Sequence, residues 1–510
     1  MQSQTATPFV YAPPQEDARD TSPSRSLSTR WSLILIFTAS LLVRLVGLGK
    51  FPAIMADEGL WTESSKNYVL YGDPFMDRLT HALLSPLFHV LSNLAFTVTG
   101  PSIASARLIS AVAGAASPVL FFVLIRRITQ RRDLAICGAL LFSVSEWAAF
   151  QSRAALIESL QLALILLTVV LLTFDGWRMA ALAGLACSLV FLTKVNALFV
   201  LAPCTVLIVE RARGIAAAAE SELSWKSVIV RSVIFVGTSL GVAGLVYALL
   251  YFRWPLEFTR AFRFELDGKH FEALSHPLIR VGRFGLDPVF AGRTVLSLFR
   301  EEPFLLVLAS LGVILAASVR QRGSLFFAAW LLIGGAYFLT QMFQPIRYFY
   351  LILPAVLFFA VVAIDSISSQ KPALTGWSIR PRTMAMSVIM LFELAYFAAN
   401  GVANRAAGYA NVVRWMQENT QPADRVLASA LLSTDLKNRS YQFYRLVAPP
   451  ADLTTATQDY HIRYVVVDTS EWPLALRSEV AHRFRLVRQW PNAAVYEVPS
   501  LSAACCAEAR

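Results

Sequence analysis

The dominant pattern along the chain is a series of long apolar runs separated by short polar segments. Each run approaches the roughly 20 residues that a helix needs to cross a bilayer core of about 30 Å. This pattern predicts an all-α polytopic membrane protein with about eleven transmembrane helices. The predicted spans are residues 32–49, 104–125, 134–150, 158–174, 178–193, 195–209, 232–252, 303–319, 324–341, 348–365 and 384–402.

A further apolar stretch, residues 82–99, decides the orientation of everything that follows it. If this stretch does not span, the short loops 126–133, 210–231, 320–322 and 366–383 all lie on one side, and all carry Arg or Lys. Cytoplasmic loops are enriched in these residues. The sequence therefore predicts that residues 82–99 lie at the outer surface as a juxtamembrane helix, with the N-terminus cytoplasmic and the C-terminus outside the inner membrane.

This topology divides the chain into three parts. Residues 1–30 are polar and are expected to form a disordered cytoplasmic tail, and residues 31–402 form the transmembrane domain with outer loops 50–103 and 253–302. Residues 403–510 are expected to form a small extracytoplasmic α/β domain. Helices are predicted for 409–419 and 474–484, and strands for 425–430, 464–467 and 494–498.

Composition agrees with a membrane protein, because 56% of the residues are hydrophobic and only 15% are charged. The net charge of +11 could suggest nucleic acid as a partner. That class is rejected because the basic residues lie in short loops between apolar runs, where membrane orientation accounts for most of them. The five Cys form no disulfide framework or metal-binding spacing.

The most suggestive chemistry lies in residues 51–59, Phe-Pro-Ala-Ile-Met-Ala-Asp-Glu-Gly. Here Asp57 and Glu58 place two adjacent carboxylates where a membrane helix should meet water. Paired acids at such an edge are candidates for a functional site. The alternative is structural: Asp57 would cap the helix that begins near Leu60.

Other polar residues fall on the same predicted side from separate loops and helix ends: Arg107, Arg153, Glu158, Lys194 and Arg347. Each alone is explained by a side chain that extends to the interface. Together they indicate an outward-opening cavity, in which carboxylates bind a polar substrate and cations bind a phosphate. Lys194 would be a point-charge ligand, or a helix break; Arg347 would clamp a lipid phosphate, or anchor an aromatic belt.

Histidines on the predicted outer face, including His81 and His270, could join a carboxylate in binding Zn²⁺ or Mn²⁺. The sequence has no tight ligand spacing, so a divalent metal is possible but not required. It also lacks a Gly-rich phosphate loop and a Gly-x-Ser-x-Gly elbow, which leaves a serine hydrolase unsupported.

Several short motifs occur in a fixed order: Ala-Asp-Glu-Gly at 56–59, Tyr-Gly-Asp at 71–73, Ser-Pro-Leu at 85–87, Gly-Pro-Ser at 100–102, Ala-Arg-Leu-Ile-Ser at 106–110, Arg153 to Glu158, Leu-Thr-Lys at 192–194, and Arg347-Tyr348 with Pro354. This order resembles the integral-membrane glycosyltransferases of the GT-C fold. The resemblance is strongest to the bacterial branch with lipid A aminoarabinose transferase and the rhizobial core transferases, together with the protein O-mannosyltransferases.

The resemblance implies inverting transfer of a sugar from a polyprenyl-monophosphate donor to a hydroxyl of a lipid, glycan or protein on the outer face. Asp57 would be the general base, with Glu58 beside it. Lys194, Arg347 and Arg107 would bind the donor phosphate, and Glu158, Arg153 and Tyr348 would line the sugar and acceptor pocket.

The chain departs from the family at three points. It has Glu158 where the family often has Asp, and one proline, Pro86, where the family often has two. Leu84-Ser85 replaces a metal-binding glutamate of the aminoarabinose enzyme, and His270 only loosely matches its metal-binding histidine.

Two other classes of protein stay open. A transporter or lipid flippase also needs polar residues in a membrane cavity, but it usually shows inverted repeats or broken helices near mid-span. A non-catalytic assembly protein of the cell envelope would depend on residues 403–510 and would leave Asp57, Lys194 and Arg347 dispensable.

Overall fold

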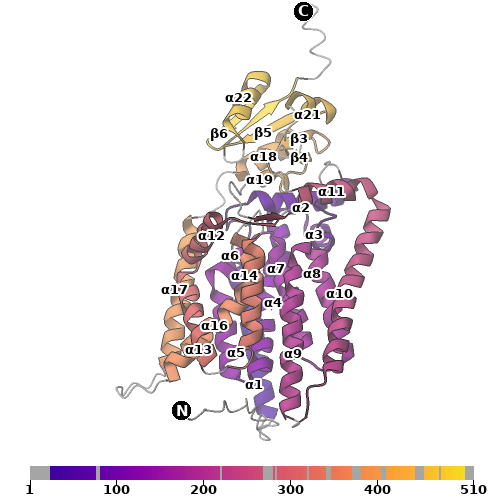
Figure 1. Cartoon of the computed structure of the whole chain (residues 1–510). Coiled ribbons are helices and arrows are strands. Elements are labelled where there is room, and N and C mark those ends of the chain that lie inside the picture. Colours follow the sequence, from indigo (N-terminus) through magenta and orange to yellow (C-terminus); the bar gives the residue numbers. More distant parts are fainter. Residues whose placement is uncertain are drawn as a thin grey trace, which may run out of the picture.

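The computed structural model describes residues 23–75, 81–218, 221–267, 279–281, 284–318, 321–340, 346–369, 381–403, 409–442, 453–469 and 472–499. A bundle of long helices carries a small α/β domain at one end (Figure 1). The bundle contains α1 (Pro23–Leu45), α4 (Ile103–Thr129), α5 (Arg132–Val144), α6 (Glu146–Arg153), α7 (Ile157–Leu172), α8 (Trp177–Thr193), η1 (Val195–Val200), α9 (Leu201–Ala218), α10 (Trp225–Arg253), α13 (Pro303–Ser318), α14 (Ser324–Leu339), α15 (Ile346–Phe349), η2 (Tyr350–Ile352), α16 (Leu353–Ser369) and α17 (Pro381–Ala403).

Every apolar run of the sequence falls on one of these helices or on a bent pair of them. By length and apolar composition, five described helices can cross a membrane, or up to seven if each bent pair, α5–α6 and α12–α13, is one span. Three more apolar helices, α7, α8 and α14, are shorter. The polytopic helical class is therefore confirmed, whereas the count of eleven spans stays a prediction.

The loops predicted to be cytoplasmic meet at the end of the bundle away from the α/β domain. Arg131, after α4, pairs with Asp365 of α16 at 2.6 Å. Asp175, before α8, pairs with Arg231 of α10 at 3.3 Å and with Arg211 of α9 at 3.4 Å. These ion pairs join segments that the charge pattern had assigned to one side. The compartment that each end faces stays a prediction.

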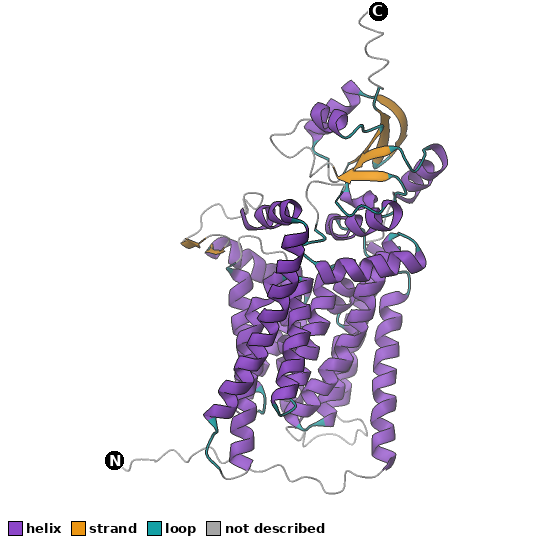
Figure 2. Ribbon diagram, turned by 90° about the vertical axis from the view of Figure 1, so that its right-hand side faces the viewer, coloured by secondary structure: helices purple, strands orange, loops and turns teal. Residues whose placement is uncertain are grey.

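The opposite end carries α2 (Ala56–Tyr71) and α3 (Pro86–Thr99) under the α/β domain (Figures 1 and 2). Helix α3 lies within the stretch predicted to be juxtamembrane. At about 1.5 Å per residue its 14 residues reach only ~21 Å, which is short for a span. Its buried residues Phe88 and Phe96 lie opposite an exposed stripe, Val90, Leu94 and Val98. Such a stripe is typical of an interfacial helix.

The described part of loop 253–302, predicted to lie outside, contains two helices and two strands before the bundle resumes. Helix α11 (Pro255–Asp267) is followed by a short antiparallel hairpin of β1 (Ile279–Val281) and β2 (Phe284–Leu286). Helix α12 (Pro288–Glu301) then leads into α13 through a bend of 108°. Asp287 caps α12 by accepting backbone N–H groups of Val289 and Phe290 at 3.0 and 3.1 Å.

The C-terminal domain has a five-stranded sheet in the order β4-β3-β5-β7-β6. Its strands are β3 (Arg425–Ala428), β4 (Arg439–Gln442), β5 (Tyr464–Asp468), β6 (Arg485–Trp490) and β7 (Ala493–Glu497). Strands β4, β3 and β5 are parallel, whereas β7 and β6 run antiparallel. The helices of the domain are α18 (Tyr409–Asn419), α19 (Ala430–Ser433), α21 (Leu453–Asp459) and α22 (Leu474–Arg483).

The prediction found the three buried strands of this sheet and missed the two edge strands. All five residues of β5 are buried, so the sequence Tyr-Val-Val-Val-Asp reads as a strand. Edge strand β6, Arg-Leu-Val-Arg-Gln-Trp, is largely exposed, and its apolar residues do not alternate with its polar ones. Edge strand β4, Arg-Ser-Tyr-Gln, is mostly polar.

The arrangement of the two ends predicts a labelling pattern for single cysteine probes. We expect probes at the exposed residues Gln130 and Arg178 to react only from the cytoplasmic side with a membrane-impermeant reagent, and probes at Thr97 and Gln458 only from outside. The reason is the Arg and Lys bias of the loops. Labelling of Gln130 and Thr97 with the reverse sidedness would refute the predicted orientation.

Candidate active site

Helix α2 presents its two adjacent acids in different directions. Met55 is the N-cap residue, and the carboxylate of Glu58 accepts its backbone N–H at 3.0 Å. Glu58 therefore does the capping, as the third residue of a capping box. The alternative that Asp57 caps the helix is wrong. Successive helical residues point about 100° apart, which leaves the side chain of Asp57 34% exposed while that of Glu58 is fully buried.

Asp57 and Glu158 share one guanidinium. Arg347, in α15, directs Nη1 at the Oδ2 of Asp57, and its Nε lies 3.4 Å from Oε1 of Glu158, in the first turn of α7. Glu158 is fully buried, Arg347 is 11% exposed, and Asp57 is the accessible member of the three. The structure thus joins three predicted site residues that lie far apart in the sequence. Two carboxylates around one cation leave the group with a net negative charge.

Lys194 contacts Tyr348, the residue that follows Arg347. The Nζ of Lys194 donates to the hydroxyl of Tyr348 at 2.7 Å, and it lies 4.4 Å from the Tyr348 ring centroid and 5.2 Å from that of Trp61. Lys194 is the C-cap of α8, where a cation is favoured by the helix dipole. The ammonium group of Lys194 is thus bonded to the residue that follows Arg347 in the chain.

Glu58 and Arg107 are fully occupied with each other. Arg107, on α4, forms two hydrogen bonds of 2.7 Å to the Glu58 carboxylate and a third, of 2.9 Å, to the carbonyl of Leu48. Glu58 also accepts the backbone N–H of Ala155 at 2.7 Å. Both side chains are 0% exposed. This geometry argues against a phosphate contact for Arg107 and a substrate contact for Glu58, and favours a supporting role for both.

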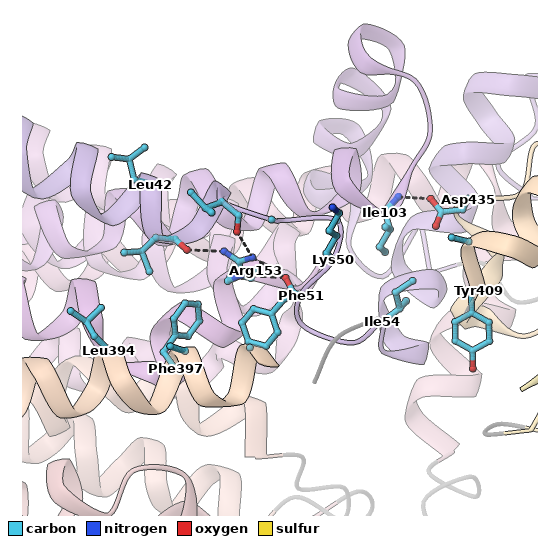
Figure 3. Close-up of a pocket in the computed structure, with 17 residues that line it drawn as sticks. Leu42, Lys50, Phe51, Ile54, Ile103, Arg153, Leu394, Phe397, Tyr409 and Asp435 are labelled. Carbon is cyan, nitrogen blue, oxygen red and sulfur yellow. Dashed lines mark hydrogen bonds between the residues drawn. The ribbon is translucent and has the colours of Figure 1, made fainter. Parts of the chain in front are cut away.

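Arg153 likewise supports the site from behind. Its guanidinium is buried and donates to the carbonyls of Val43, Val46 and Phe51 at 2.7 to 3.2 Å. These bonds hold the turn between α1 and α2. Arg153 also lines an apolar cavity of about 1020 Å³ between α1, α17 and the C-terminal domain (Figure 3). Neither these bonds nor this cavity wall includes Glu158 or Tyr348, with which Arg153 was predicted to line the sugar and acceptor pocket.

The predicted metal ligands do not come together in the described part of the chain. No group of three His, Cys, Asp or Glu side chains there could hold a metal ion. His81 packs edge-on against Trp61, with ring centroids 4.6 Å apart. His270 lies outside the described residues. His89 is instead bonded to Ser65 at 2.7 Å, and burial lowers its pKa to about 4.

The sequence reasoning missed the polar face of α2, which joins the helix to the C-terminal domain. Lys66 donates to the carbonyl of Ser433 at 2.7 Å and to the hydroxyl of Ser440, which donates to Glu63 at 2.8 Å. Thr62 and Thr434 share a hydrogen bond of 2.8 Å. The run from Thr62 to Asn67 is polar yet buried. Six consecutive polar residues inside a helix are a signal that this helix needs a polar partner.

A second contact between domain and bundle reinforces this junction. The Oδ1 of Asp435 accepts the backbone N–H of Ile103, the first residue of α4, at 2.8 Å. Burial raises the pKa of Asp435. The C-terminal domain is thus bonded both to the helix that carries Asp57 and to the helix that carries Arg107.

Comparison with known proteins agrees with this fold. Residues 34–251 match the family described as dolichyl-phosphate-mannose-protein mannosyltransferase. The structure of ArnT from Cupriavidus metallidurans bound to undecaprenyl phosphate superposes with a TM-score of 0.63 at 13% identity, covering 92% of this chain and 98% of that one. Its apo state gives a TM-score of 0.61 at 14% identity and the same coverage.

A mycobacterial arabinofuranosyltransferase, AftD, gives a TM-score of 0.50 at 15% identity, covering 92% of this chain and 40% of that one. A search of the curated proteins finds no match. The matched domain and the shared fold show that the chain has the GT-C fold of these glycosyltransferases, and the resemblance read from the motifs is confirmed.

The close packing of α2 against α19 predicts that Gly59 has no room for a side chain. A Cβ at this position would overlap the carbonyl oxygen of Ala430. We expect Gly59→Ala to destabilise the protein by about 1–3 kcal/mol, the usual cost of overpacking, and to increase hydrogen exchange in α2.

Gly237→Ala is the matched control, because a Cβ there, on α10, meets nothing within 4 Å. Equal thermal stability of Gly59→Ala and Gly237→Ala would contradict the rigid junction.

Proposed function

We propose that this protein transfers a sugar from a polyprenyl-monophosphate donor to a hydroxyl acceptor at the outer face of the membrane, with inversion and with Asp57 as the general base. The observation that carries the proposal is the cluster of Asp57, Arg347 and Lys194 at the end of the bundle next to the C-terminal domain. In it, one accessible carboxylate pairs with Arg347, and Lys194 contacts the Tyr348 ring that Arg347 also approaches.

The two cations suit the leaving group of this reaction. As the bond between the anomeric carbon and the phosphate oxygen breaks, its electron pair stays on the phosphate and increases the negative charge there. A guanidinium binds phosphate through two directed N–H groups, and an ammonium acts as a point charge. Glu158 is buried and lies 3.4 Å from the Nε of Arg347, within ion-pair distance of the guanidinium. The structure of ArnT with undecaprenyl phosphate supports this class of donor.

Asp57 suits the other half of the reaction. The acceptor hydroxyl must lose its proton while its oxygen attacks the anomeric carbon, and a carboxylate within hydrogen-bond reach can accept that proton. Attack on the face opposite the phosphate inverts the anomeric centre. Asp57 is the exposed acid of the cluster, whereas Glu158 and Glu58 are fully buried. The acceptor is a hydroxyl of a lipid, glycan or protein.

The direct test is to incubate the purified protein in lipid with a panel of polyprenyl-phosphate sugars and to measure release of polyprenyl phosphate. Release from at least one donor, in the presence of a membrane-lipid or glycan extract as acceptor source, is the expected result. An absence of release from every donor with every acceptor source would overturn the proposed activity.

The donor site predicts the effect of removing each cation. Lys194→Ala and Arg347→Ala should each weaken binding of polyprenyl phosphate by roughly 10- to 100-fold, because each removes a charge-assisted hydrogen bond worth about 1.5–3 kcal/mol. Arg347→Lys should restore only part of the affinity, since an ammonium cannot form the two-pronged contact.

Arg178→Ala, at the opposite end of the bundle, is the control and should bind like the wild type. Unchanged affinity in both site variants would remove the phosphate assignment.

The base assignment predicts that Asp57→Asn lowers turnover by roughly 10²- to 10⁴-fold, the usual range for loss of a general base. Asn keeps the size of the side chain but cannot accept the proton at neutral pH. Asp73→Asn is the control, because Asp73 is an exposed acid just beyond the other end of α2.

Thermal stability and binding of polyprenyl phosphate should be measured on both variants, since Asp57 also pairs with Arg347. An Asp57→Asn protein that folds and turns over within about threefold of wild type, well inside the lower bound above, would show that Asp57 is not the base.

A further inference from the structure

Helix α12 lies at the end of the bundle that carries the C-terminal domain (Figure 1). The bend of 108° places it nearly at right angles to α13, which continues into the bundle. Helix α13 packs on α16 so closely that a Cβ at Gly312 would overlap the carbonyl oxygen of Phe359. It also exposes Phe304, Val307 and Ile314, at 50%, 59% and 68%. Because α13 is apolar and belongs to a candidate span, these residues face lipid, and α12 then lies along the surface of the bilayer.

The exposed face of α12 combines apolar residues with two arginines. Its exposed apolar side chains are Val289, Val295, Leu296 and Phe299, and its exposed charged side chains are Arg293 and Arg300. The two arginines are two helical turns apart, so both lie on the stripe of Leu296. Thr294 and Leu298 are buried and face the protein. An apolar face that carries basic residues is typical of a helix lying in the membrane interface.

The acids at the ends of α12 have other positions or partners. Asp287 is buried and accepts the N–H groups that begin the helix. Glu301, at the other end, lines a second cavity of about 360 Å³ together with Met55, Glu146 and Ile346. In the described part of the chain, neither arginine of the exposed face forms an ion pair.

The charge of the surrounding loop makes the same point at the level of the sequence. Residues 253–302 include eight Arg and Lys residues, although short loops on the side predicted to be external are expected to be poor in them. Membrane orientation therefore does not account for these charges, and an anionic partner does. Arginine binds phosphate through two directed N–H groups, and its apolar stem can lie along acyl chains while the guanidinium reaches the headgroups.

We propose that the exposed face of α12 is a docking surface for anionic phospholipids of the leaflet on the side of the C-terminal domain. Arg293 and Arg300 bind the lipid phosphates, and Leu296 and Phe299 lie among the acyl chains. A zwitterionic lipid binds more weakly, because its own cation competes with the arginines for the phosphate. These lipids are components of the bilayer and are not substrates, so the surface does not depend on the proposed sugar transfer.

The test reconstitutes the full chain into phosphatidylcholine vesicles with a trace of photoactivatable phosphatidylglycerol or, in a parallel sample, of photoactivatable phosphatidylcholine. After illumination and digestion with a protease that does not cleave at Arg, lipid attached within residues 288–301 is measured by mass spectrometry. Helix α3, residues 86–99, is the internal reference, because it has an exposed apolar stripe but no Lys or Arg.

Three double variants separate charge from packing. Arg293→Gln with Arg300→Gln removes both charges, whereas Arg293→Lys with Arg300→Lys keeps them. Arg414→Gln with Arg488→Gln is the matched control, since both are exposed arginines of the C-terminal domain.

Wild type is expected to attach the anionic lipid to residues 288–301 in clear preference to the zwitterionic one. The Gln pair should lower this labelling roughly 10- to 30-fold, which corresponds to about 1.4–2 kcal/mol for two basic residues at an anionic surface. The Lys pair should keep most of it, and the control pair should label like wild type. Labelling of α3 should be similar for both lipids and unchanged in every variant, as should thermal stability.

The docking surface is refuted if residues 288–301 are not labelled, if both lipids label them equally, or if the Gln pair labels like wild type. Loss of the label on addition of an equal amount of polyprenyl phosphate would assign the face to the sugar donor instead. A dimer in which residues 288–301 are protected from lipid would assign it to a second copy of the chain. None of these outcomes depends on turnover, so they are distinct from failure of the proposed function.

Discussion

The ion pair between Glu58 and Arg107 is the interaction on which the rest of the site depends. Removing two charges from water costs several kcal/mol per ion, and the loss is recovered only where geometry and additional hydrogen bonds are favourable. Here the carboxylate also accepts the N–H groups of Met55 and Ala155, and the guanidinium also donates to Leu48. The pair thus ties the turn before α2 to α4 and to the start of α7, so that Asp57 emerges at a defined point.

Helix α2 has a second constraint on its far side. Gly59 lets the helix approach the backbone of α19, and Lys66 and Glu63 form buried hydrogen bonds to the C-terminal domain. The helix is therefore held between the bundle and the domain. A helix that is polar along its length would be unstable in either environment alone, because its buried donors and acceptors need partners. The domain supplies these partners, which gives it a structural role in positioning Asp57.

The cluster around Asp57 and the nearby cavities differ in the charged groups that they contain. Arg347 and Lys194 offer cationic N–H donors to an anionic leaving group, and Asp57 and Glu158 balance their two charges. Glu146 and Glu301 place two carboxyl groups in the wall of the adjacent cavity, and the larger cavity between α1 and α17 is mostly apolar. Two short segments, 51–58 and 346–348, carry Asp57 and Arg347 and also contribute to the wall of the smaller cavity.

The sequence by itself determined the features that depend on local composition. Apolar runs of bilayer length predict helices because lipid leaves the backbone no other partners, and β-branched runs such as 464–467 predict buried strands. Asp57, Lys194 and Arg347 could be named because charges at the end of an apolar run are unusual wherever the chain folds.

Only the tertiary structure decided which of the neighbouring charges is available. Glu58, Arg107 and Arg153 look equally functional in the sequence, yet their partners lie from 49 to 110 residues away and neutralise or satisfy them. The edge strands, the docking face of α2 and both cavities depend on the same long-range packing. Burial and hydrogen bonding arise only when segments come together, so no single segment contains them.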